Sequence, residues 1–250
     1  MSAMRAIPAL IVCAVLAACS VPGPGEAPDG IWDPNEAGNR KTHEFNRKLD
    51  KRVLRGSGNG YTRTVPEGVR KSVSNFADTT SLPQTVVNQI LQGRPGPATR
   101  NTLRFAVNAT LGFGGIADVA SNMGMPKDES DFGETLHVWG VPEGAYVELP
   151  FLGPSTERDT AGRVVDLVTD PLSYVLPVGA RRTATAARIV AKVGERGEFS
   201  GTVDSLLYDS ADSYAQLRLI YLQNRRFELD GTEGAAGDYI DPEEIDTEGF

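Results

Sequence analysis

The chain has 250 residues, of which 40% are hydrophobic and 23% are charged, and its formal net charge is −8. Nine acidic groups and no Lys or Arg lie within residues 228–250, and the rest of the chain has no basic stripe. This distribution argues against a nucleic-acid partner. No apolar stretch after residue 18 is long enough for a conventional transmembrane helix, while the length suits one large domain or two small ones.

The N-terminus has the features of a secretion signal. One cation, Arg5, precedes an uncharged apolar stretch of thirteen residues that ends at Ala18. This stretch is shorter than the ~20 residues that a membrane-spanning helix needs, and it matches the apolar region of a signal peptide. It ends in Leu16-Ala17-Ala18-Cys19, a lipobox in which small residues precede a cysteine. We therefore expect residues 1–18 to be a lipoprotein signal peptide and Cys19 to be lipidated.

The segment after the signal resembles a tether. Residues 19–30 are rich in Pro and Gly and have no apolar periodicity, which is typical of a flexible linker. Cys13 lies within the signal, so Cys19 remains without an intramolecular disulfide partner. Ser20 stands where Asp would commonly retain a lipoprotein in the inner membrane. We therefore expect a lipid anchor on the periplasmic side of the outer membrane.

From Asp33 onward the pattern predicts successive helices. Asp33-Pro34-Asn35-Glu36 combines an N-cap acid, a Pro at the first helical position and a Glu three residues after the cap. The helix that follows has a narrow apolar stripe among charged faces, formed by Ala37, Phe45, Leu49 and Val53. Such a helix fits either a wet interface or the plain surface of a domain.

The next helices are punctuated by Pro and Gly. Pro66 is predicted to open a helix, Leu82-Pro83 to break it, and Gln92-Gly93 to close the helix that follows. Pro97 begins another, whose apolar side contains Leu103, Ala106, Val107, Thr110 and Leu111. The run Gly112-Phe113-Gly114-Gly115 then predicts a flexible hinge or a close approach of two helices. A nucleotide loop is disfavoured because the preceding segment is helical and no Gly-Lys-Ser/Thr follows.

The middle of the chain has a different pattern. Residues 131–153 sustain no helical periodicity, so we predict a short β-hairpin or an irregular segment there. Ser155 is predicted to cap the helix that follows, whose apolar face contains Ala161, Val164, Val165 and Val168. Two further helices are expected, from about Arg181 to Val193 and from about Val203 to Phe227. Residues 228–250 are predicted to be a disordered acidic tail. The predicted fold class is mainly α, with short interrupted helices over residues 31–227.

Three sets of residues could suggest an enzyme or a metal site, but each lacks the companion residues that such a site needs. Asp131-Phe132-Gly133 matches a kinase triplet, but the other kinase motifs are missing. His137, Ser155 and Asp159 could form a catalytic triad, but the Gly-x-Ser-x-Gly motif is missing, so a lipid hydrolase is the weaker alternative. His43 has no partner set for a zinc site. We expect a protein that is not an enzyme and that needs no metal or cofactor.

Longer strings occur in a fixed order between residues 30 and 226. They are Asp33-Pro34, Phe45-Asn46-Arg47, Val65-Pro66-Glu67-Gly68-Val69-Arg70, Val73-Ser74-Asn75-Phe76, Leu91-Gln92-Gly93, Asn108 to Gly115 with Asp118, Asp131 to Leu136, Trp139-Gly140, and Leu152-Gly153-Pro154-Ser155 with Arg158-Asp159. This ordered set resembles the MlaA family, also called VacJ lipoproteins. Gly38 and Asn39 depart from the family pattern within the first helix.

The resemblance implies a compact ring-like bundle of helices in the inner leaflet of the outer membrane. An amphipathic channel would remove mislocalised phospholipids from the outer leaflet and maintain lipid asymmetry. The implied partners are phospholipids, a soluble periplasmic lipid carrier and trimeric porins. Beside this channel, Gly112, Phe113, Gly114 and Gly115 are the candidate hinge, and Arg47 and Lys48 are candidate contacts for lipid headgroups. The alternative function is an envelope scaffold that associates with porins without transporting lipid.

Overall fold

The computed structural model describes residues 21–238 of the chain, apart from residues 24, 28 and 29. The predicted signal peptide, residues 1–18, and the predicted lipidation site, Cys19, lie outside the described residues. Part of the predicted tether, residues 19–30, lies outside them as well.

The described chain is mainly helical, which confirms the predicted fold class. Its helices are α2 (Glu36–Leu49), α3 (Arg55–Thr64), α4 (Glu67–Leu91), α5 (Pro95–Thr110), α6 (Val119–Asn122), α7 (Phe132–Val138), α8 (Glu157–Thr169), α9 (Leu172–Val175), α10 (Val178–Glu198), α11 (Ser200–Asp204) and α12 (Ser213–Asp238). Two π-helical segments, η1 (Asp50–Leu54) and η2 (Ser205–Asp209), follow α2 and α11.

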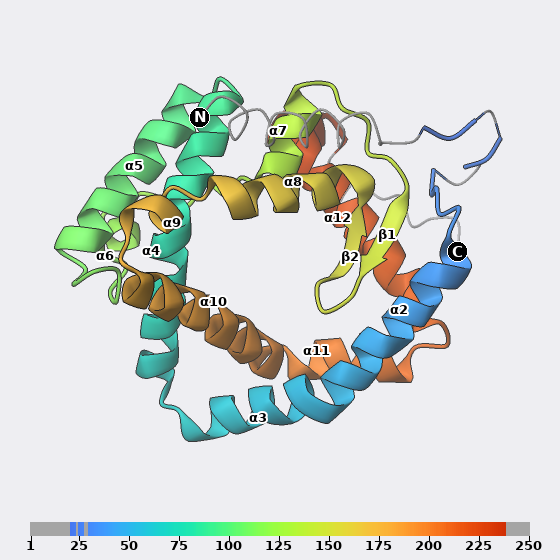
Figure 1. Ribbon diagram of the computed structural model, residues 1–250, viewed down its shortest axis with the longest axis horizontal. Helices are drawn as coiled ribbons and strands as arrows, with labels where there is room; N and C mark the ends of the chain where they lie inside the picture. The colour runs from blue at the N-terminus through green and yellow to red at the C-terminus, as the bar shows by residue number, and fades with distance from the viewer. Residues whose placement is uncertain (1–20, 24, 28–29, 239–250) are drawn as a thin grey trace, which may run out of the picture.

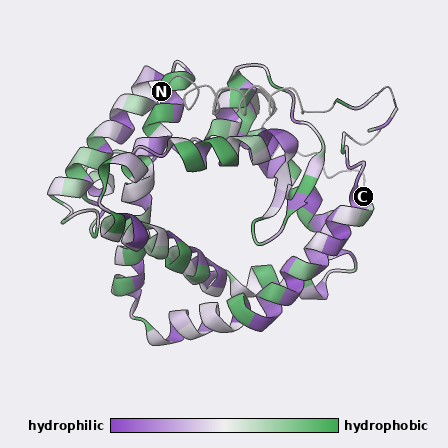
Figure 2. Ribbon diagram, viewed as in Figure 1, coloured by the Kyte–Doolittle hydropathy of each residue, from purple (hydrophilic) through white to green (hydrophobic). Residues whose placement is uncertain are grey.

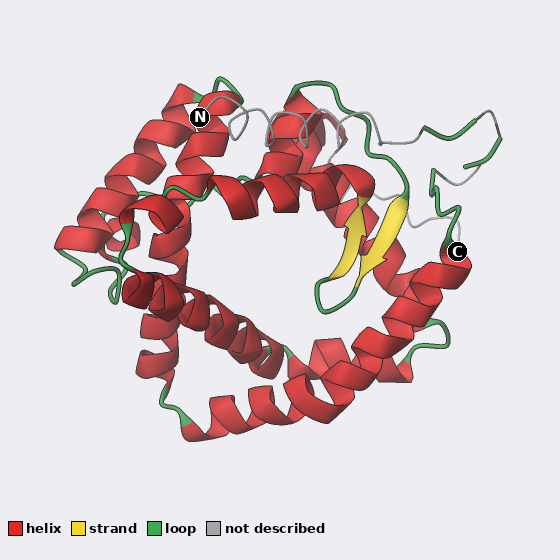
Figure 3. Cartoon of the chain, viewed as in Figure 1, coloured by secondary structure: helices red, strands yellow, loops and turns green. Residues whose placement is uncertain are grey.

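Two strands, β1 (Tyr146–Leu149) and β2 (Gly153–Thr156), form an antiparallel hairpin. Tyr146 pairs with Thr156, and Leu149 pairs with Gly153. This hairpin confirms one of the two structures predicted for residues 131–153. Figure 3 shows this hairpin as the sheet of the described chain, whose other regular elements are helices.

The helices follow one another around a ring (Figure 1). In this view α2 and α3 form the right and lower sides, α4 and α5 the left side, and α8 the upper side, while α10 crosses α4 and runs toward α11. The hairpin turn lies inside the ring in the same view. Within the described residues, no helix combines the length and apolarity needed to cross a membrane.

The structure adds a helix that the periodicity did not predict. Residues 132–138 form α7 inside the segment that was expected to sustain no helix, so that part of the prediction is wrong. The Asp131 side chain accepts a hydrogen bond from the Glu134 N–H at 2.8 Å and caps the helix. The sequence signal was Asp131 followed three residues later by Glu134, a helix-start pattern. The helix is only seven residues long, and an element this short shows little periodicity.

Two predicted helix boundaries are also wrong. Pro83 lies inside α4, which continues from Glu67 to Leu91. The predicted single helix from Val203 to Phe227 is instead divided into α11, η2 and α12. Ser210 is extended between η2 and α12, and the Asp212 side chain accepts from the Ala215 N–H at 3.1 Å where α12 begins. A capping acid thus marks a new helix in a segment whose apolar stripe looks continuous.

Two predicted caps do not form either. The Asp33 carboxylate accepts from Asn39, Tyr214 and Arg218 rather than from the first turn of α2, which begins only at Glu36. Ser155 lies in β2, and the cap of α8 is the Thr156 hydroxyl, which accepts from the Asp159 N–H at 3.2 Å. In each case a partner distant in the sequence, or the hairpin register, decides the role of the residue.

The last helix extends beyond the boundary expected for the acidic tail. α12 continues to Asp238, whereas the tail was predicted from residue 228. Residues 239–250 lie outside the described residues.

The buried faces of several helices are polar. In α2 the buried side chains are Asn39 and His43, while Phe45 is 44% exposed. In α5 the buried residues are Ala98, Asn101, Arg104 and Asn108, while Leu103 and Leu111 on the predicted apolar side are 51% and 61% exposed. Figure 2 shows hydrophobic residues alternating with hydrophilic ones along the ring. The helices therefore bury polar contacts and expose much of their apolar surface, which is the reverse of a water-soluble bundle.

Candidate functional site

A polar cavity of about 400 Å³ lies between α4, α10 and the loop that precedes α7. The Lys127 ammonium bridges two carboxylates there, with Nζ 2.8 Å from Asp78 Oδ1 and 2.8 Å from Glu129 Oε1. Burial lowers the pKa of Lys127, but the hydrogen bonds to both carboxylates outweigh this effect and raise it. On the α10 side the cavity is lined by Arg188, Lys192 and Glu195 and by the small side chain of Ala191.

An apolar groove of about 690 Å³ lies between the C-terminal end of α8, α9 and the first half of α10. Its apolar lining consists of Leu167, Leu172, Leu176, Val178, Ala184, Ala186 and Ile189. Leu167 is 79% exposed and Ile189 is 60% exposed, so this apolar surface is open to whatever surrounds the protein. Exposed apolar surface on this scale is typical of a site that binds a partner or a lipid.

Arg188 lines both the polar cavity and the apolar groove. One Nη atom donates to the Thr80 carbonyl in α4 at 2.5 Å, and the other lies 3.5 Å from Asp170 Oδ2. The Nε atom is buried and has no hydrogen-bond partner among the described residues. A cation thus stands where an apolar surface meets a polar one, which is the arrangement that an amphiphilic ligand requires.

The candidate headgroup residues lie at the end of α2, next to the hairpin. Arg47 Nε is 3.0 Å from Glu44 Oε2, and Lys48 Nζ is 3.6 Å from Glu44 Oε1. The Arg47 side chain is 39% exposed and that of Lys48 is 61% exposed, so both remain accessible, although Glu44 offsets part of their charge. Neither residue lines the polar cavity or the apolar groove.

Contacts between α2 and the hairpin turn lie beside these two cations. The Phe45 and Phe151 rings meet edge to face with their centroids 5.2 Å apart. Asn46 donates to the Leu149 carbonyl at 2.9 Å and accepts from the Phe151 N–H at 2.8 Å. Phe151 has a positive φ of 67°, a conformation that non-glycine residues rarely adopt. The α2 side chains therefore hold the hairpin turn in a strained backbone conformation.

The predicted hinge residues form a tight turn after α5. A Cβ atom on Gly112 would lie 2.2 Å from the Ala117 carbonyl oxygen, and one on Gly115 would lie 2.6 Å from the Thr79 side chain of α4. Phe113 has a φ of 54° and is 81% exposed, and Gly114 has a φ of 75°. These glycines permit the close approach of backbone segments, one of the two roles that the sequence predicted. Movement of the turn remains a prediction.

An ion pair between the buried Arg104 and the partly exposed Asp118 stabilises this turn. Arg104 donates to both carboxylate oxygens of Asp118 at 3.1–3.2 Å, and Asn108 donates to Asp118 Oδ1 at 3.0 Å. Burial raises the pKa of Asp118, but hydrogen bonds from Ser121 and Asn108 together with the Arg104 charge lower it to about 2. The motif Asn108 to Gly115 with Asp118 is therefore a folded unit in which the polar side chains position the turn.

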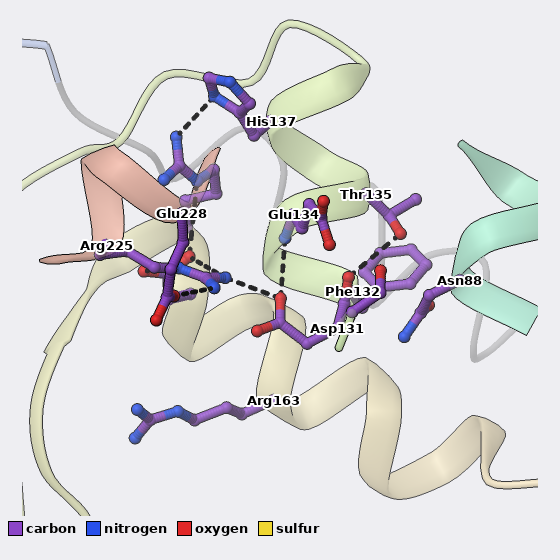
Figure 4. A network of polar contacts seen from close by, with 12 residues as sticks. Asn88, Asp131, Phe132, Glu134, Thr135, His137, Arg163, Arg225 and Glu228 are labelled. Carbon is purple, nitrogen blue, oxygen red and sulfur yellow. Dashed lines mark hydrogen bonds and ion pairs between the residues drawn. The ribbon is translucent and has the colours of Figure 1, made fainter. Parts of the chain in front are cut away.

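The string Asp131 to Leu136 also has a structural role (Figure 4). The Asp131 carboxylate, which caps α7, accepts a hydrogen bond from Arg225 of α12 at 2.7 Å. Arg225 also pairs with the buried Asp159 of α8 at 3.2 Å, and Tyr221 donates to the same carboxylate at 2.7 Å. Burial raises the pKa of Asp159, but these contacts outweigh it and lower the pKa. The network therefore ties α7, α8 and α12 together.

Gly133 of this string lies where α7 meets α8. A Cβ atom on Gly133 would lie 2.6 Å from Asp159 Oδ1, and a Cβ atom on Gly162 would lie 2.3 Å from the Gly133 nitrogen. The triplet that resembles a kinase motif thus provides a helix cap, an apolar core residue and a glycine for close helix packing.

The hypothetical triad residues do not form a triad. His137 contacts Arg158 at 3.3 Å. The Ser155 hydroxyl accepts from Thr160 at 3.0 Å, and Asp159 binds Tyr221 and Arg225. None of the three side chains hydrogen-bonds directly to another, although Arg158, which contacts His137, also lies 3.5 Å from Asp159 Oδ1.

Comparison with known proteins identifies the family. Residues 31–228 match the model of the MlaA lipoprotein family. The chain belongs to the MlaA lipoprotein family. This result confirms the resemblance seen in the ordered strings.

Two relatives of this MlaA family member are described as lipid transport lipoproteins, and a third is uncharacterized. The chain is 33% identical over 225 residues to the intermembrane phospholipid transport system lipoprotein MlaA of Escherichia coli, covering 88% of this chain and 86% of that protein. It is 29% identical over 204 residues to the protein of the same description from Haemophilus influenzae, covering 79% of each chain. An uncharacterized protein of Rickettsia conorii is 33% identical over 189 residues, which is 75% of this chain and 74% of that one.

The fold is also shared with a solved structure, described as the structural basis for maintenance of bacterial outer membrane lipid asymmetry. It superposes with a TM-score of 0.68 at 33% identity and covers 79% of this chain and 98% of that chain. The MlaA fold of this chain is thus found by sequence and by structure alike.

The arginines of the groove were missed at the sequence level. Arg181, Arg182 and Arg188 were seen only as part of an Ala-rich helix. The available signal was three cations within eight residues whose other members are Ala and Thr. Without the positions of α8 and α9, that pattern is also expected for a solvated helix face.

Proposed function

We propose that this MlaA family member removes mislocalised phospholipids from the outer leaflet of the outer membrane and thereby maintains lipid asymmetry. The observation that carries the proposal is the apolar groove and polar cavity that share Arg188. A phospholipid has acyl chains and a charged headgroup, so a carrier must offer both surfaces side by side. The descriptions of the Escherichia coli and Haemophilus influenzae relatives support the same function.

The inverted burial of the helices supports a location at a lipid surface. Val69, Ile90 and Leu103 are each more than half exposed, whereas Asn88, Gln89 and Asn101 are fully buried. Burying amides costs free energy unless they are hydrogen-bonded, and Asn101 donates to Gln89 at 3.1 Å. The apolar exterior can rest against acyl chains without a helix that spans the bilayer.

The proposal includes a lipid anchor at Cys19. The lipobox at residues 16–19 supports it, and Ser20 favours the outer membrane. The anchor would hold the ring on the periplasmic side, against the leaflet into which lipid is delivered. A triacylated cysteine would hold firmly, because each buried CH₂ adds ~0.8 kcal/mol.

The partners of the pathway extend the proposal. The family resemblance implies a soluble periplasmic carrier that receives the phospholipid, and trimeric porins that accompany the protein. No catalytic step is needed for such a transfer. The accessible Arg47 and Lys48 would meet headgroups, and the turn at Gly112, Phe113, Gly114 and Gly115 would be the moving part.

Outer-leaflet phospholipid in a deletion strain tests the function. We expect surface-exposed phospholipid to rise in the deletion strain, to return to normal with the wild-type gene, and to stay high with Cys19→Ala. Replacing both Arg47 and Lys48 with Glu should also raise it. Normal lipid asymmetry together with altered porin assembly in the deletion strain would favour the scaffold function instead.

A further inference from the structure

The apolar groove has a cation without a partner at its edge. Arg182 makes no hydrogen bond and no ion pair with any residue that the structure describes, although it lines the groove. Its neighbour Arg181 donates to the Ser173 carbonyl at 2.8 Å, and that bond leaves its other donors available. The groove thus contains one free guanidinium beside another that is only partly engaged.

The charge balance of the groove favours an anionic group. Asp170 is its one carboxylate among the described lining residues, against Arg181, Arg182 and Arg188. Asp170 is already engaged, since Oδ1 accepts from the Leu172 N–H at 3.0 Å and Oδ2 lies 3.5 Å from Arg188. The cations therefore exceed the acids, and the Asp170 carboxylate pairs with Arg188 and not with Arg182.

The surface beside these cations suits a hydrocarbon chain. Leu167, Tyr174 and Val175 are each more than three-quarters exposed, and Val178 is 53% exposed. Inorganic phosphate would leave this apolar surface uncovered, whereas an acyl chain would cover it. A volume of about 690 Å³ is within the usual range of small-molecule sites.

We infer that this groove is a phospholipid-binding site in which Arg182 and Arg181 bind the headgroup phosphate and the apolar walls hold an acyl chain. Guanidinium groups bind phosphate through two parallel hydrogen bonds, so a free arginine at the edge of an apolar wall selects a phosphate that is joined to a chain. Arg188 would then offer the next positive charge toward the polar cavity. The inference rests on the proposed function and specifies where the substrate is held.

Lipid binding by the purified full-length protein tests this site. The probes are dioleoyl phosphatidylglycerol and dioleoylglycerol, which share their acyl chains and differ in the headgroup phosphate. We expect Arg182→Gln to weaken binding of the phosphatidylglycerol about tenfold, the loss of one charged hydrogen bond, and to leave dioleoylglycerol binding unchanged. Because Arg182 is exposed and has no partner, this variant should fold normally. The matched control is Arg63→Gln on α3, an exposed arginine outside the groove, which should bind both lipids like the wild type.

Unchanged phosphatidylglycerol binding by Arg182→Gln would overturn the inference. So would inorganic phosphate that binds as tightly as the phospholipid, since the apolar walls would then contribute nothing. The lipid-asymmetry assay separates this result from the proposed function. If the wild-type gene restores asymmetry while Arg182→Gln binds lipid normally, the site assignment fails and the function stands. If Arg182→Gln weakens phosphatidylglycerol binding but the wild-type gene does not restore asymmetry in the deletion strain, the function fails and the site assignment stands.

Discussion

The hairpin side of the ring and the crossing of α3 with α10 are held together in different ways. On the hairpin side, Phe132 and Leu136 of α7 pack on Ala161 and Val165 of α8. A second cluster joins β1 to α12 and consists of Tyr146, Tyr214 and Leu222. At the α3–α10 crossing the backbones approach through Gly58 and Gly197, where a Cβ atom on Gly197 would lie 2.3 Å from the Gly58 oxygen.

Charged groups complete the second junction. Arg196 of α10 donates to both oxygens of Asp50 in η1 at 2.7 and 2.8 Å, and to Asp204 of α11 at 2.6 Å. Tyr208 of η2 donates to the same Asp50 carboxylate at 2.7 Å. The two π-helical segments therefore meet at one carboxylate.

The difference shows how two helices pack when much of their apolar surface is exposed. Val178, Ile189 and Val190 of α10 are 53%, 60% and 36% exposed, so much of the apolar surface of α10 is not buried in helix packing. Helices in a lipid environment commonly associate through small residues and polar contacts, because apolar side chains gain little by leaving lipid. The crossing follows this pattern, while the hairpin side is packed like a water-soluble core.

Removing Asp50 should have the largest effect on stability. Asp50→Ala leaves the buried Arg196 guanidinium and the Tyr208 hydroxyl without their shared acceptor, and breaking a buried ion pair costs about 3–5 kcal/mol. We expect the free energy of unfolding, measured by urea denaturation of the full chain, to fall by about that amount. Asp209→Ala on η2 is the control. A loss no larger than that of the control would show that glycine packing alone holds the junction.

Truncating the apolar core should come next. Leu136 is 1% exposed within the first cluster, and burial at this level makes Leu→Ala cost about 3 kcal/mol, through lost burial and the cavity that remains. The same urea measurement on Leu136→Ala checks this value. Leu111→Ala, at a residue that is 61% exposed, is the comparison and should change little. Equal losses at the two sites would contradict the contrast between a packed side and an inverted side.

A methyl group in the crossing should cost about 2 kcal/mol. Gly197→Ala places a Cβ atom against the Gly58 backbone, so α3 and α10 must move apart. Gly60→Ala in α3 is the matched control, because a Cβ atom there meets nothing within 4 Å. We expect this control to gain up to about 1 kcal/mol from reduced backbone entropy in the unfolded chain. Destabilisation by both changes would indicate that helix packing is not the cause.

Acid should loosen the turn after α5 by a smaller amount. The contacts of Asp118 lower its pKa from the ordinary 3.8 to about 2 in the folded chain, so they stabilise the fold above pH 3.8 and lose this effect as the pH falls toward 2. Because Asp118 is partly exposed, the effect should be the smallest of the four. Comparing wild type with Asp118→Asn in urea at pH 6 and pH 3 checks this. Their difference in unfolding free energy should shrink at pH 3, and a constant difference would exclude titration of Asp118.

Much of the fold was predictable because its signals are local. The mainly helical class, the turn at Gly93 and a hairpin, predicted as one of two structures for residues 131–153, follow from periodicity and turn residues. The continuous α4 was not predicted, since Pro83 is tolerated only where neighbouring contacts compensate for it. The candidate site was largely unpredictable, because Arg182 and Arg188 line a groove and a cavity whose other walls come from α8, α9 and α4.

The amino-acid sequence by itself determined the family, the expected anchor at Cys19 and the two faces of each helix. Only the tertiary structure decided which face is buried. In α5 the amides and Arg104 lie inside while Leu103 and Leu111 lie outside. Periodicity reports that a helix has an apolar and a polar side, but the choice between them depends on whether water or lipid surrounds the protein. Which face of each helix is buried depends on how the helices pack against one another, and this is known only from the assembled ring.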